Sequence, residues 1–252
     1  MSNLTYSRVV DIKRLQFIKR SLDSIDKEES LILDVGCGNG LISHHLGALG
    51  FKIHGIDISQ KAIDRANSLN KSTNVSFFCK SAEDLKAEGQ LYDAIICSEV
   101  LEHLDNPVKL LKELHKLLKD SGVLIVTVPH GMGPREVMVT KPMQWIKKNN
   151  KKLWNKISKI KKVMGYSGTT VQSDSDDLTH LQFFTKKDLL SISKACNYKI
   201  TDFEKSDFIE DVFPVSFLTK RSQLLQKLDC KIADILPHYL AAGFHSKWIK
   251  EI

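Results

Sequence analysis

The chain has 252 residues, of which 42% are hydrophobic and 27% are charged, and its formal net charge is +7. This composition excludes a disordered or collagen-like chain, and the length suits one α/β domain with an elaboration. The longest apolar run, 123–128, is too short to span a bilayer, and we expect no leader before the fold.

The positive charge is concentrated in one segment. Residues 147–162 hold eight lysines and no acid. Without them, 37 − 8 = 29 basic residues stand against 30 acidic ones, a net charge of −1. Since the rest of the protein is neutral, a domain that lies along nucleic acid is not expected.

The cysteines are odd in number and have no C-x-x-C spacing. This pattern predicts reduced thiols in a cytoplasmic protein. They are Cys37, Cys79, Cys97, Cys196 and Cys230.

The first half of the chain alternates strand-like and helix-like segments. A lead-in helix is expected at about 7–22, packed on the edge of a sheet. Strands are then predicted at 31–35, 51–56, 75–79, 92–97 and 122–128, and helices at 39–49, 59–70 and 106–119. In the last helix, Asn106 is the expected N-cap and Pro107 the first helical residue. Continuous apolar strands between helices predict a parallel sheet covered on both faces.

The pattern breaks between residues 129 and 177, where we expect an insertion with one or two helices. It resumes with a helix at 185–196, for which Thr185 is the N-cap, a strand at 199–204, a helix at about 220–236 and a closing strand at 243–250. We therefore predict a single domain over 1–252, in which 131–178 form an inserted lid on the acceptor side.

Three glycines follow the first predicted strand, in the order Gly36-x-Gly38-x-Gly40. A buried strand, a tight turn and a helix N-terminus together form a site for a nucleoside-containing ligand at the carboxyl edge of a sheet. Asp34 would repel a pyrophosphate but favour a cationic amino-acid group. Asp57 ends the second strand, where an acid accepts hydrogen bonds from both hydroxyls of a ribose.

The run Leu33-Asp-Val-Gly-Cys-Gly-Asn-Gly40 resembles the first motif of class I S-adenosylmethionine (SAM) methyltransferases. Residues 97–104, Cys-Ser-Glu-Val-Leu-Glu-His-Leu, resemble the matching segment of the ubiquinone-biosynthesis O-methyltransferases, and this resemblance spans 31–130. Residues 179–185 look more like small methyltransferases found with surface-polysaccharide genes. The resemblance implies a Rossmann-like, seven-stranded, mostly parallel sheet with an antiparallel last strand.

The resemblance also implies a set of SAM-binding residues, with the arginine approaching the SAM carboxylate and Ala82 and Glu83 near the adenine. For Glu83, a helix-capping role is an open alternative. The set is Arg14, Asp34, Gly36, Cys37, Gly38, Asp57, Ile58, Ala82, Glu83 and Ser98.

Glu99, Glu102 and His103 would face the same way in a helical turn, so they could bind one divalent metal such as Mg²⁺. Methyltransferases that act on small-RNA 3′ ends have a similar motif and a further, distant histidine ligand to the metal. In this sequence His180 is the candidate for that ligand. Alternatively, the turn binds no metal and only caps the helix and forms the bottom of the SAM pocket. Without a metal, His103 or His180 is the candidate general base. His130 is expected to be an exposed loop residue.

The segment 145–164 predicts a basic amphipathic helix. Leu153, Ile157, Ile160 and Met164 recur at helical spacing among the lysines. Such a helix suits an anionic acceptor or peripheral contact with the inner face of an anionic membrane. The alternative is an ordinary lid helix. We predict that the segment acts on the acceptor rather than on SAM.

The expected activity is SAM-dependent methyl transfer to a hydroxyl of a small molecule, a sugar or glycan precursor, during polysaccharide biosynthesis. The alternative is a metal-dependent O-methyltransferase of a quinol, a catechol or an RNA 3′ end. A dinucleotide-dependent oxidoreductase would need its third glycine one position later. A SAM-binding protein without catalysis stays open, and the oligomeric state is not indicated.

Overall fold

The structure of the chain is a computed structural model. It describes residues 6–86, 89–163, 181–212, 215–219 and 221–251, and the side chains of 86 and 160–163 lie outside this description.

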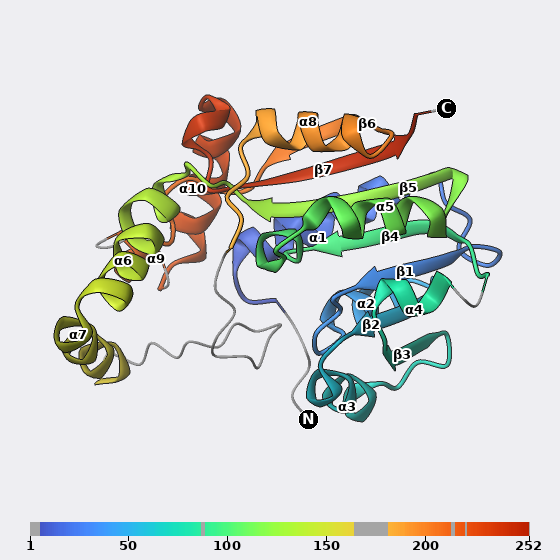
Figure 1. Cartoon of the computed structure of the whole chain (residues 1–252), viewed down its shortest axis with the longest axis horizontal. Coiled ribbons are helices and arrows are strands. Elements are labelled where there is room, and N and C mark those ends of the chain that lie inside the picture. Colours follow the sequence, from blue (N-terminus) through green and yellow to red (C-terminus); the bar gives the residue numbers. More distant parts are fainter. Residues whose placement is uncertain (1–5, 87–88, 164–180, 213–214, 220, 252) are drawn as a thin grey trace.

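A seven-stranded sheet of order β3-β2-β1-β4-β5-β7-β6 forms the centre of the molecule (Figure 1). Its strands are β1 (Leu31–Val35), β2 (Lys52–Asp57), β3 (Val75–Cys79), β4 (Tyr92–Ser98), β5 (Leu118–Pro129), β6 (Tyr198–Lys205) and β7 (Gly243–Lys250). The pairs from β3 to β5 are parallel, whereas β7 runs antiparallel to both β5 and β6. The predicted fold class is therefore confirmed, including the antiparallel last strand.

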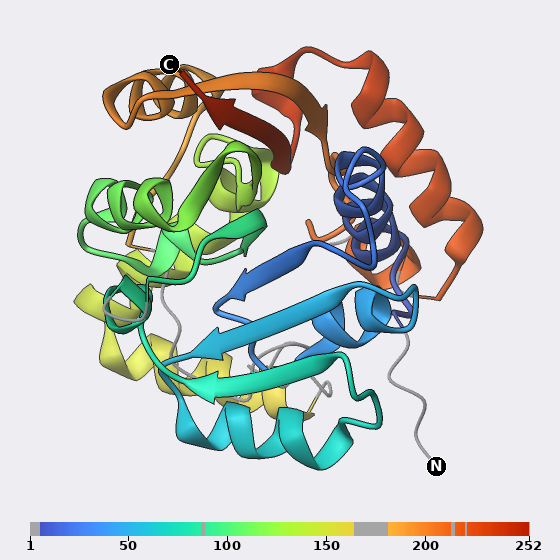
Figure 2. The ribbon, with the colours of Figure 1, turned by 90° about the vertical axis from the view of Figure 1, so that its right-hand side faces the viewer.

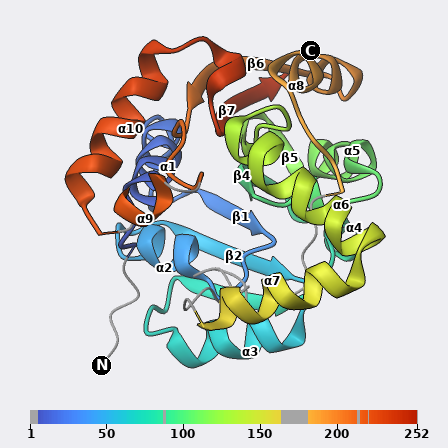
Figure 3. The ribbon, with the colours of Figure 1, turned by 90° about the vertical axis from the view of Figure 1, so that its left-hand side faces the viewer.

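Helices cover both faces of the sheet (Figures 2 and 3), and each face has its own apolar core. One face holds α1 (Val9–Ser21), α2 (Leu41–Gly47), α3 (Gln60–Leu69) and α10 (Gln223–Ile235). The other holds α4 (Ala82–Lys86), α5 (Pro107–Leu117) and α8 (Lys186–Ala195). The continuous apolar strands thus bury both sides, as the sequence predicts.

The sequence predicts the lead-in helix at the edge of the sheet, and this prediction is wrong. Helix α1 packs on the face formed by β5 and β7 and also contacts α10. The reason is its apolar side, since Phe17 and Ile18 are fully buried in the core of that face. Burial of two large apolar side chains favours a face over an edge.

Side-chain caps set the ends of two helices as predicted. Asn106 accepts the amide of Lys109 at 3.1 Å, and Pro107 begins α5. Thr185 and Asp188 form a reciprocal capping box at the start of α8. The predicted helix at 106–119 runs two residues too far, because Leu118 already pairs with Tyr92 as the first residue of β5.

The insertion contains the π-helix η2 (Glu136–Thr140), then α6 (Lys141–Asn149) and α7 (Lys151–Val163). Two further elements, α4 and α9 (Val215–Thr219), were not predicted from the sequence, because five residues are too short to display a helical period. Short 3₁₀ turns, η1 (Leu101–His103) and η3 (His238–Leu240), complete the described elements. Within the described part of the chain, no helix has the length and apolar character needed to cross a membrane.

Candidate functional site

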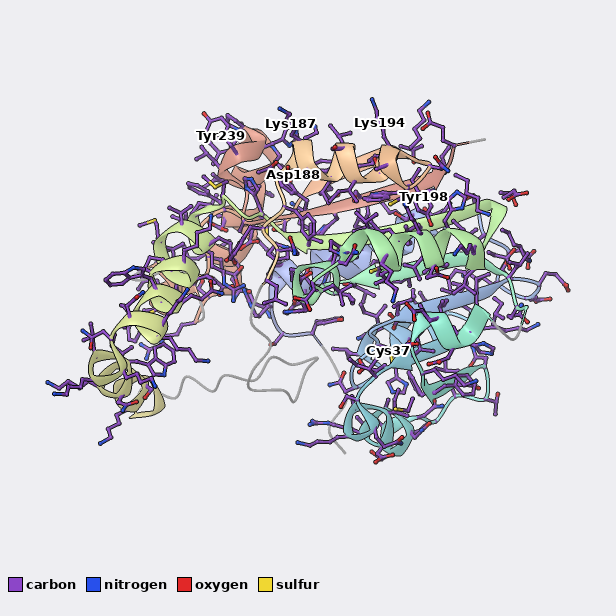
Figure 4. The ribbon with its side chains drawn as sticks, in the orientation of Figure 1. Cys37, Lys187, Asp188, Lys194, Tyr198 and Tyr239 are labelled. Carbon is purple, nitrogen blue, oxygen red and sulfur yellow. The ribbon has the colours of Figure 1, made fainter. Side chains whose placement is uncertain are left out.

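The glycine turn lies between β1 and α2, at the carboxyl edge of the sheet, where Figure 4 labels Cys37. Gly36, Gly38 and Gly40 all have left-handed backbone, with φ of 66°, 55° and 78°. A Cβ on Gly36 would lie 2.5 Å from Cγ2 of Val100, the residue that follows Glu99 after β4. Only glycine therefore fits this turn without strain, and its backbone stays open to close approach by a ligand.

Asp57 fixes the turn to the end of β2. Its Oδ2 accepts the amide of Gly38 at 3.0 Å, and its Oδ1 accepts the amide of Ser59 at 2.8 Å. The amide of Cys37 also donates to the carbonyl of Ile56, at 3.0 Å. The carboxylate is half-buried, and carboxylate oxygens accept more than one hydrogen bond each. It is thus placed to hold the glycine turn and still receive ribose hydroxyls.

Ile58 follows Asp57 with its side chain 83% exposed. An isolated exposed isoleucine is ordinary, but this one adjoins the predicted ribose acid. The assignment of Ile58 to the cofactor site stays a prediction.

Asp34 lies beneath the turn and is only 2% exposed. It accepts the hydroxyl of Ser43 at 2.6 Å, which ties β1 to α2. Burial raises the pKa of Asp34 to about 7; the Ser43 hydrogen bond opposes this shift and the nearby Asp57 charge adds to it. In this conformation Asp34 anchors the turn, and its contact with a cationic group stays a prediction.

The buried Asp34 predicts a pH-dependent stability. An unfolded aspartate ionises near pH 4, so the folded state holds the proton more tightly. The stability that protonated Asp34 contributes to the free energy of unfolding is fully present below about pH 4 and is lost as the pH rises through about 7. Relative to the wild type, Asp34→Asn should therefore gain up to about 4 kcal/mol in unfolding free energy between about pH 4 and pH 8. Urea titrations followed by circular dichroism measure this, with exposed Asp64→Asn as the control. Parallel pH profiles for wild type and Asp34→Asn would show that Asp34 has no raised pKa.

The segment after β3 shows which acid caps α4, and this decides one of the two roles expected for Glu83. Ala82 is buried, 4% exposed, at the start of α4. The acid that caps α4 is Asp84, whose Oδ2 accepts the amide of Ser81 at 2.7 Å. Glu83 instead forms an ion pair of 2.6 Å with Lys109 on the surface. The capping alternative for Glu83 is therefore wrong, because the aspartate one position later occupies the cap.

A chain of polar contacts links Arg14 to the end of β4. Arg14 Nη1 lies 3.6 Å from Glu99 Oε1, the same oxygen accepts the hydroxyl of Thr127 at 2.9 Å, and Thr127 pairs with Ser98 at 2.9 Å. Arg14 also binds Asp11 at 2.8 Å. Its Nε is buried without a hydrogen-bond partner in the described structure. Arg14 thus keeps one buried donor that a ligand carboxylate would satisfy.

The predicted helical turn from Glu99 to His103 does not form. Glu99 has a left-handed backbone, with φ of 56°, and only 101–103 are helical, as η1. Glu99 therefore turns toward Arg14. Glu102 is buried, with 1% exposure, and its Oε1 lies 3.7 Å from His103 Nε2. The expectation of one shared face is corrected by this break in the backbone.

The metal site fits poorly on these residues. Among the described residues, the potential ligand atoms of Glu99, Glu102 and His103 do not form a group within 4.8 Å of one another. Such a group is found instead in three buried acids: Asp207, Glu210 and Asp229. The Arg14 guanidinium beside Glu99 would also compete with a cation. His180 lies outside the described residues, so its catalytic and metal-binding roles stay predictions. We derive no chemical step through a metal.

Glu102 is a buried acid with an unusual environment. Its Oε2 has no hydrogen-bond partner in the described part of the chain. Burial, and then repulsion from Glu99, raises the pKa of Glu102 well above its usual range; the charge of fully buried Glu136 in η2 adds to this shift. The carbonyl of Glu102 accepts the amide of Leu181 at 2.7 Å, which joins this turn to the chain after the insertion.

His130 is not exposed, contrary to the sequence-based expectation. It is 2% exposed, and its backbone amide donates to the Ala242 carbonyl, just before β7, at 2.8 Å. Its ring contacts Phe244 in a tilted arrangement, with ring centroids 4.6 Å apart. Its Nδ1 lies 2.9 Å from the Ala241 carbonyl. Burial lowers the pKa of His130, so the residue supports the sheet edge as a neutral ring.

Three residues near the site were missed by sequence reasoning. Val100 blocks any side chain at Gly36, Thr127 joins Glu99 to Ser98, and Glu136 adds a buried charge beside Glu102. No local pattern marks them, since each acts through a neighbour that is distant in sequence. Only the hydroxyl of Thr127, within an otherwise apolar strand, was a usable signal.

The sheet order, the antiparallel β7 and a glycine turn facing Asp57 define an α/β protein with a nucleoside-binding edge of the class I methyltransferase type. A family model described as a methyltransferase domain matches residues 11–202. The chain therefore belongs to this methyltransferase domain family.

Curated relatives match a little less than half of the chain. A ubiquinone biosynthesis O-methyltransferase of Coxiella burnetii is 34% identical over 113 residues, which are 44% of this chain and 47% of that protein. The protein of the same name from Rickettsia canadensis is 37% identical over 125 residues, 47% of this chain and 52% of that protein. The chain thus spans about half the length of the curated relatives it matches.

Solved structures match nearly the whole chain in fold. The plantazolicin methyltransferase BamL, in complex with a triazolic desmethylPZN analog and SAH, superposes with a TM-score of 0.58 at 17% identity, over 98% of this chain and 86% of that one. Magnesium protoporphyrin IX methyltransferase from Synechocystis PCC 6803, with bound SAH, gives 0.53 at 16% identity, over 96% and 81%. At these identities the likeness concerns the fold alone.

Proposed function

We propose that this chain is a SAM-dependent methyltransferase that methylates a hydroxyl group of a small molecule. The observation that carries the proposal is the glycine turn, in which Gly36 has no room for a Cβ and the Gly38 amide binds Asp57. Membership of the methyltransferase domain family supports it. Bound SAM supplies a sulfonium-activated methyl group, so the protein contributes mainly by positioning and desolvation.

The described residues suit the separate parts of SAM. We assign the ribose hydroxyls to Asp57, the adenine to exposed Ile58 and the carboxylate to the buried Nε of Arg14. Gly36 and Gly38 leave the backbone accessible between them. These assignments keep the residues predicted from the sequence, with Arg14 now supported by its unpartnered donor.

We place the acceptor beside His103 and Glu102, after the carboxyl end of β4. His103 Nε2 lies 3.7 Å from Glu102 Oε1, and the imidazole side chain is 18% exposed. A buried acid beside an imidazole orients the ring, and imidazole accepts a hydroxyl proton at neutral pH. His103 is therefore our candidate general base, with Glu102 as a positioning residue.

We propose a sugar or glycan precursor as the acceptor, in the cytoplasm. The support is the resemblance of 179–185 to methyltransferases found with polysaccharide genes and the lysine-rich segment, which would attract an anionic sugar precursor. The second candidate is a phenolic hydroxyl of a quinol precursor. It is favoured by the identity of 34–37% to ubiquinone biosynthesis O-methyltransferases over 44–47% of this chain.

The test has two stages, with the full chain. Calorimetry with SAM and with its demethylated product should detect binding of both ligands. Methyl transfer from labelled SAM is then measured on nucleotide-linked sugars, quinols and RNA, and turnover on the sugars supports the first candidate. Turnover confined to quinols selects the second candidate, and turnover confined to RNA contradicts both. Absence of SAM binding would overturn the proposed function.

Asp57→Ala should weaken SAM binding by about 10- to 150-fold, the equivalent of roughly 1.5–3 kcal/mol for hydrogen bonds to a charged acceptor. The loss should exceed that of any single Lys→Ala change in 147–162, for which exposed Lys152→Ala is the control. Asp57→Asn keeps the shape of the side chain and one acceptor for the Gly38 amide, so it separates turn geometry from charge. Calorimetric titration gives the affinities. An unchanged dissociation constant in Asp57→Ala would remove Asp57 from the cofactor site.

A further inference from the structure

The insertion extends away from the sheet as a pair of helices, which we call the lysine arm (residues 136–159). Among the described elements, η2 continues directly into α6, and α6 contacts α7. Figures 1 and 3 show the arm on the side of the sheet where the parallel strands end, with α7 at its far end. The arm thus presents a surface next to the candidate site that the core of the domain does not cover.

Large apolar side chains are exposed along the lysine arm. Met138 is 62% exposed, Trp145 64%, Val137 44% and Leu153 41%. Met138 lies in the π-helix η2, and Trp145 lies in α6, which follows η2 without a break. Single exposed apolar residues are common, but several in one helical pair with a tryptophan among them indicate an interaction surface.

Lysines surround these apolar residues. Lys147, Lys148, Lys151 and Lys152 are all exposed at the junction of α6 and α7, and Lys156 and Lys159 continue the exposed row. No acidic residue occurs between 147 and 162, whereas the remainder of the chain has a net charge of −1. The arm therefore combines positive charge with exposed apolar side chains on one local surface.

This combination fits an anionic lipid bilayer better than a nucleic acid. Lysines near an anionic membrane each contribute about fivefold in affinity, and tryptophan prefers the bilayer interface. A phosphate-tracking surface would spread its charge over a larger face and would have no use for exposed Met138 and Leu153. Charge complementarity and the apolar side chains thus select the same partner.

We propose that the lysine arm docks on an anionic membrane surface, with Met138, Trp145 and Leu153 in the interfacial region and the lysines at the headgroups. The carboxyl edge of the sheet then lies near the bilayer. Methyl acceptors that are lipid-linked would reach the site from that surface. Membrane binding does not depend on the proposed methyl transfer, so the two proposals can fail separately.

The test is flotation of the full chain with phosphatidylcholine vesicles, with and without phosphatidylserine. We expect flotation only with the anionic vesicles, and release between about 0.1 M and 1 M salt, since the Debye length falls from about 10 Å to about 3 Å. Replacing Lys147, Lys148, Lys151 and Lys152 by glutamine should weaken binding about 100-fold or more. Trp145→Ala should weaken it about tenfold without removing the salt dependence.

The matched control replaces four exposed lysines outside the arm by glutamine: Lys61, Lys71, Lys187 and Lys194, the last two labelled in Figure 4. It has the same change in net charge and should float like the wild type. Equal loss in the control and the arm variant would overturn the proposal, as would equal flotation with both vesicles or none. Lysine-dependent binding to RNA without flotation would assign the arm to nucleic acid instead. Thermal unfolding verifies that each variant is folded.

Discussion

Gly36→Ala is expected to abolish measurable SAM binding and to lower the free energy of unfolding by about 2–5 kcal/mol. About 1–2 kcal/mol comes from a side chain in left-handed backbone, since φ is 66° here. The remainder comes from the new Cβ, which would meet Val100 Cγ2 at 2.5 Å in a packed region, where overpacking costs about 1–3 kcal/mol. Denaturant unfolding and calorimetry with SAM measure the two effects.

The chain offers a matched control for this substitution. Gly50 also has a left-handed backbone, with φ of 97°, but nothing lies within 4 Å of the position of its Cβ. Gly50→Ala should therefore show the backbone strain alone and keep SAM binding. The double variant Gly36→Ala with Val100→Ala should regain part of the lost stability. Equal destabilisation by Gly36→Ala and Gly50→Ala would contradict the steric role of Val100.

His103→Ala is expected to lower kcat by about 10²–10⁴-fold, the usual contribution of a general base, while SAM affinity stays within about twofold. The reason is the position of the imidazole, 3.7 Å from buried Glu102 and after the end of β4, where the acceptor is placed. Glu102→Gln should lower kcat less, because it replaces the orienting carboxyl group but leaves the base. Steady-state kinetics with the acceptor that the turnover test selects measure both variants.

The control for His103 is His115→Ala. The ring of His115 meets the ring of Tyr198 edge to face, with ring centroids 5.0 Å apart, at the start of β6 and the opposite end of the sheet. Its loss removes an imidazole without touching the site, so kcat should be unchanged. A normal kcat in His103→Ala would show that the methyl transfer proceeds without this base, by positioning alone.

Most of the fold was predictable because its signals are local. The alternation of apolar strands with helices, the Asn106 and Thr185 caps and the glycine turn each depend on residues a few positions apart. The predicted ends differ from the observed ones by a few residues, as for the helix at 106–119, where pairing of Leu118 with Tyr92 begins β5 early. Such shifts arise because strand pairing across the sheet decides where a helix stops.

The site was predictable in part. The position of Asp57 follows from its place at the end of the second strand, since parallel strands end at one edge of the sheet. The turn after β4 was predicted wrongly, because Glu99 is a non-glycine residue in left-handed backbone, which residue type does not indicate. The partner of Glu99, Arg14, lies on a helix 85 positions earlier in sequence (99 − 14 = 85), and no sequence-spacing rule predicts a contact over such a separation.

The sequence by itself determined the class of fold, the glycine turn and the basic amphipathic character of the insertion, because periodicity, turn chemistry and charge are properties of neighbouring residues. Only the tertiary structure decided the burial of Asp34 and His130, the place of α1 on a sheet face and the meeting of Glu136 with Glu102. The physical reason is that burial and electrostatic coupling depend on which elements pack together. Their free energies belong to contacts between segments distant in sequence.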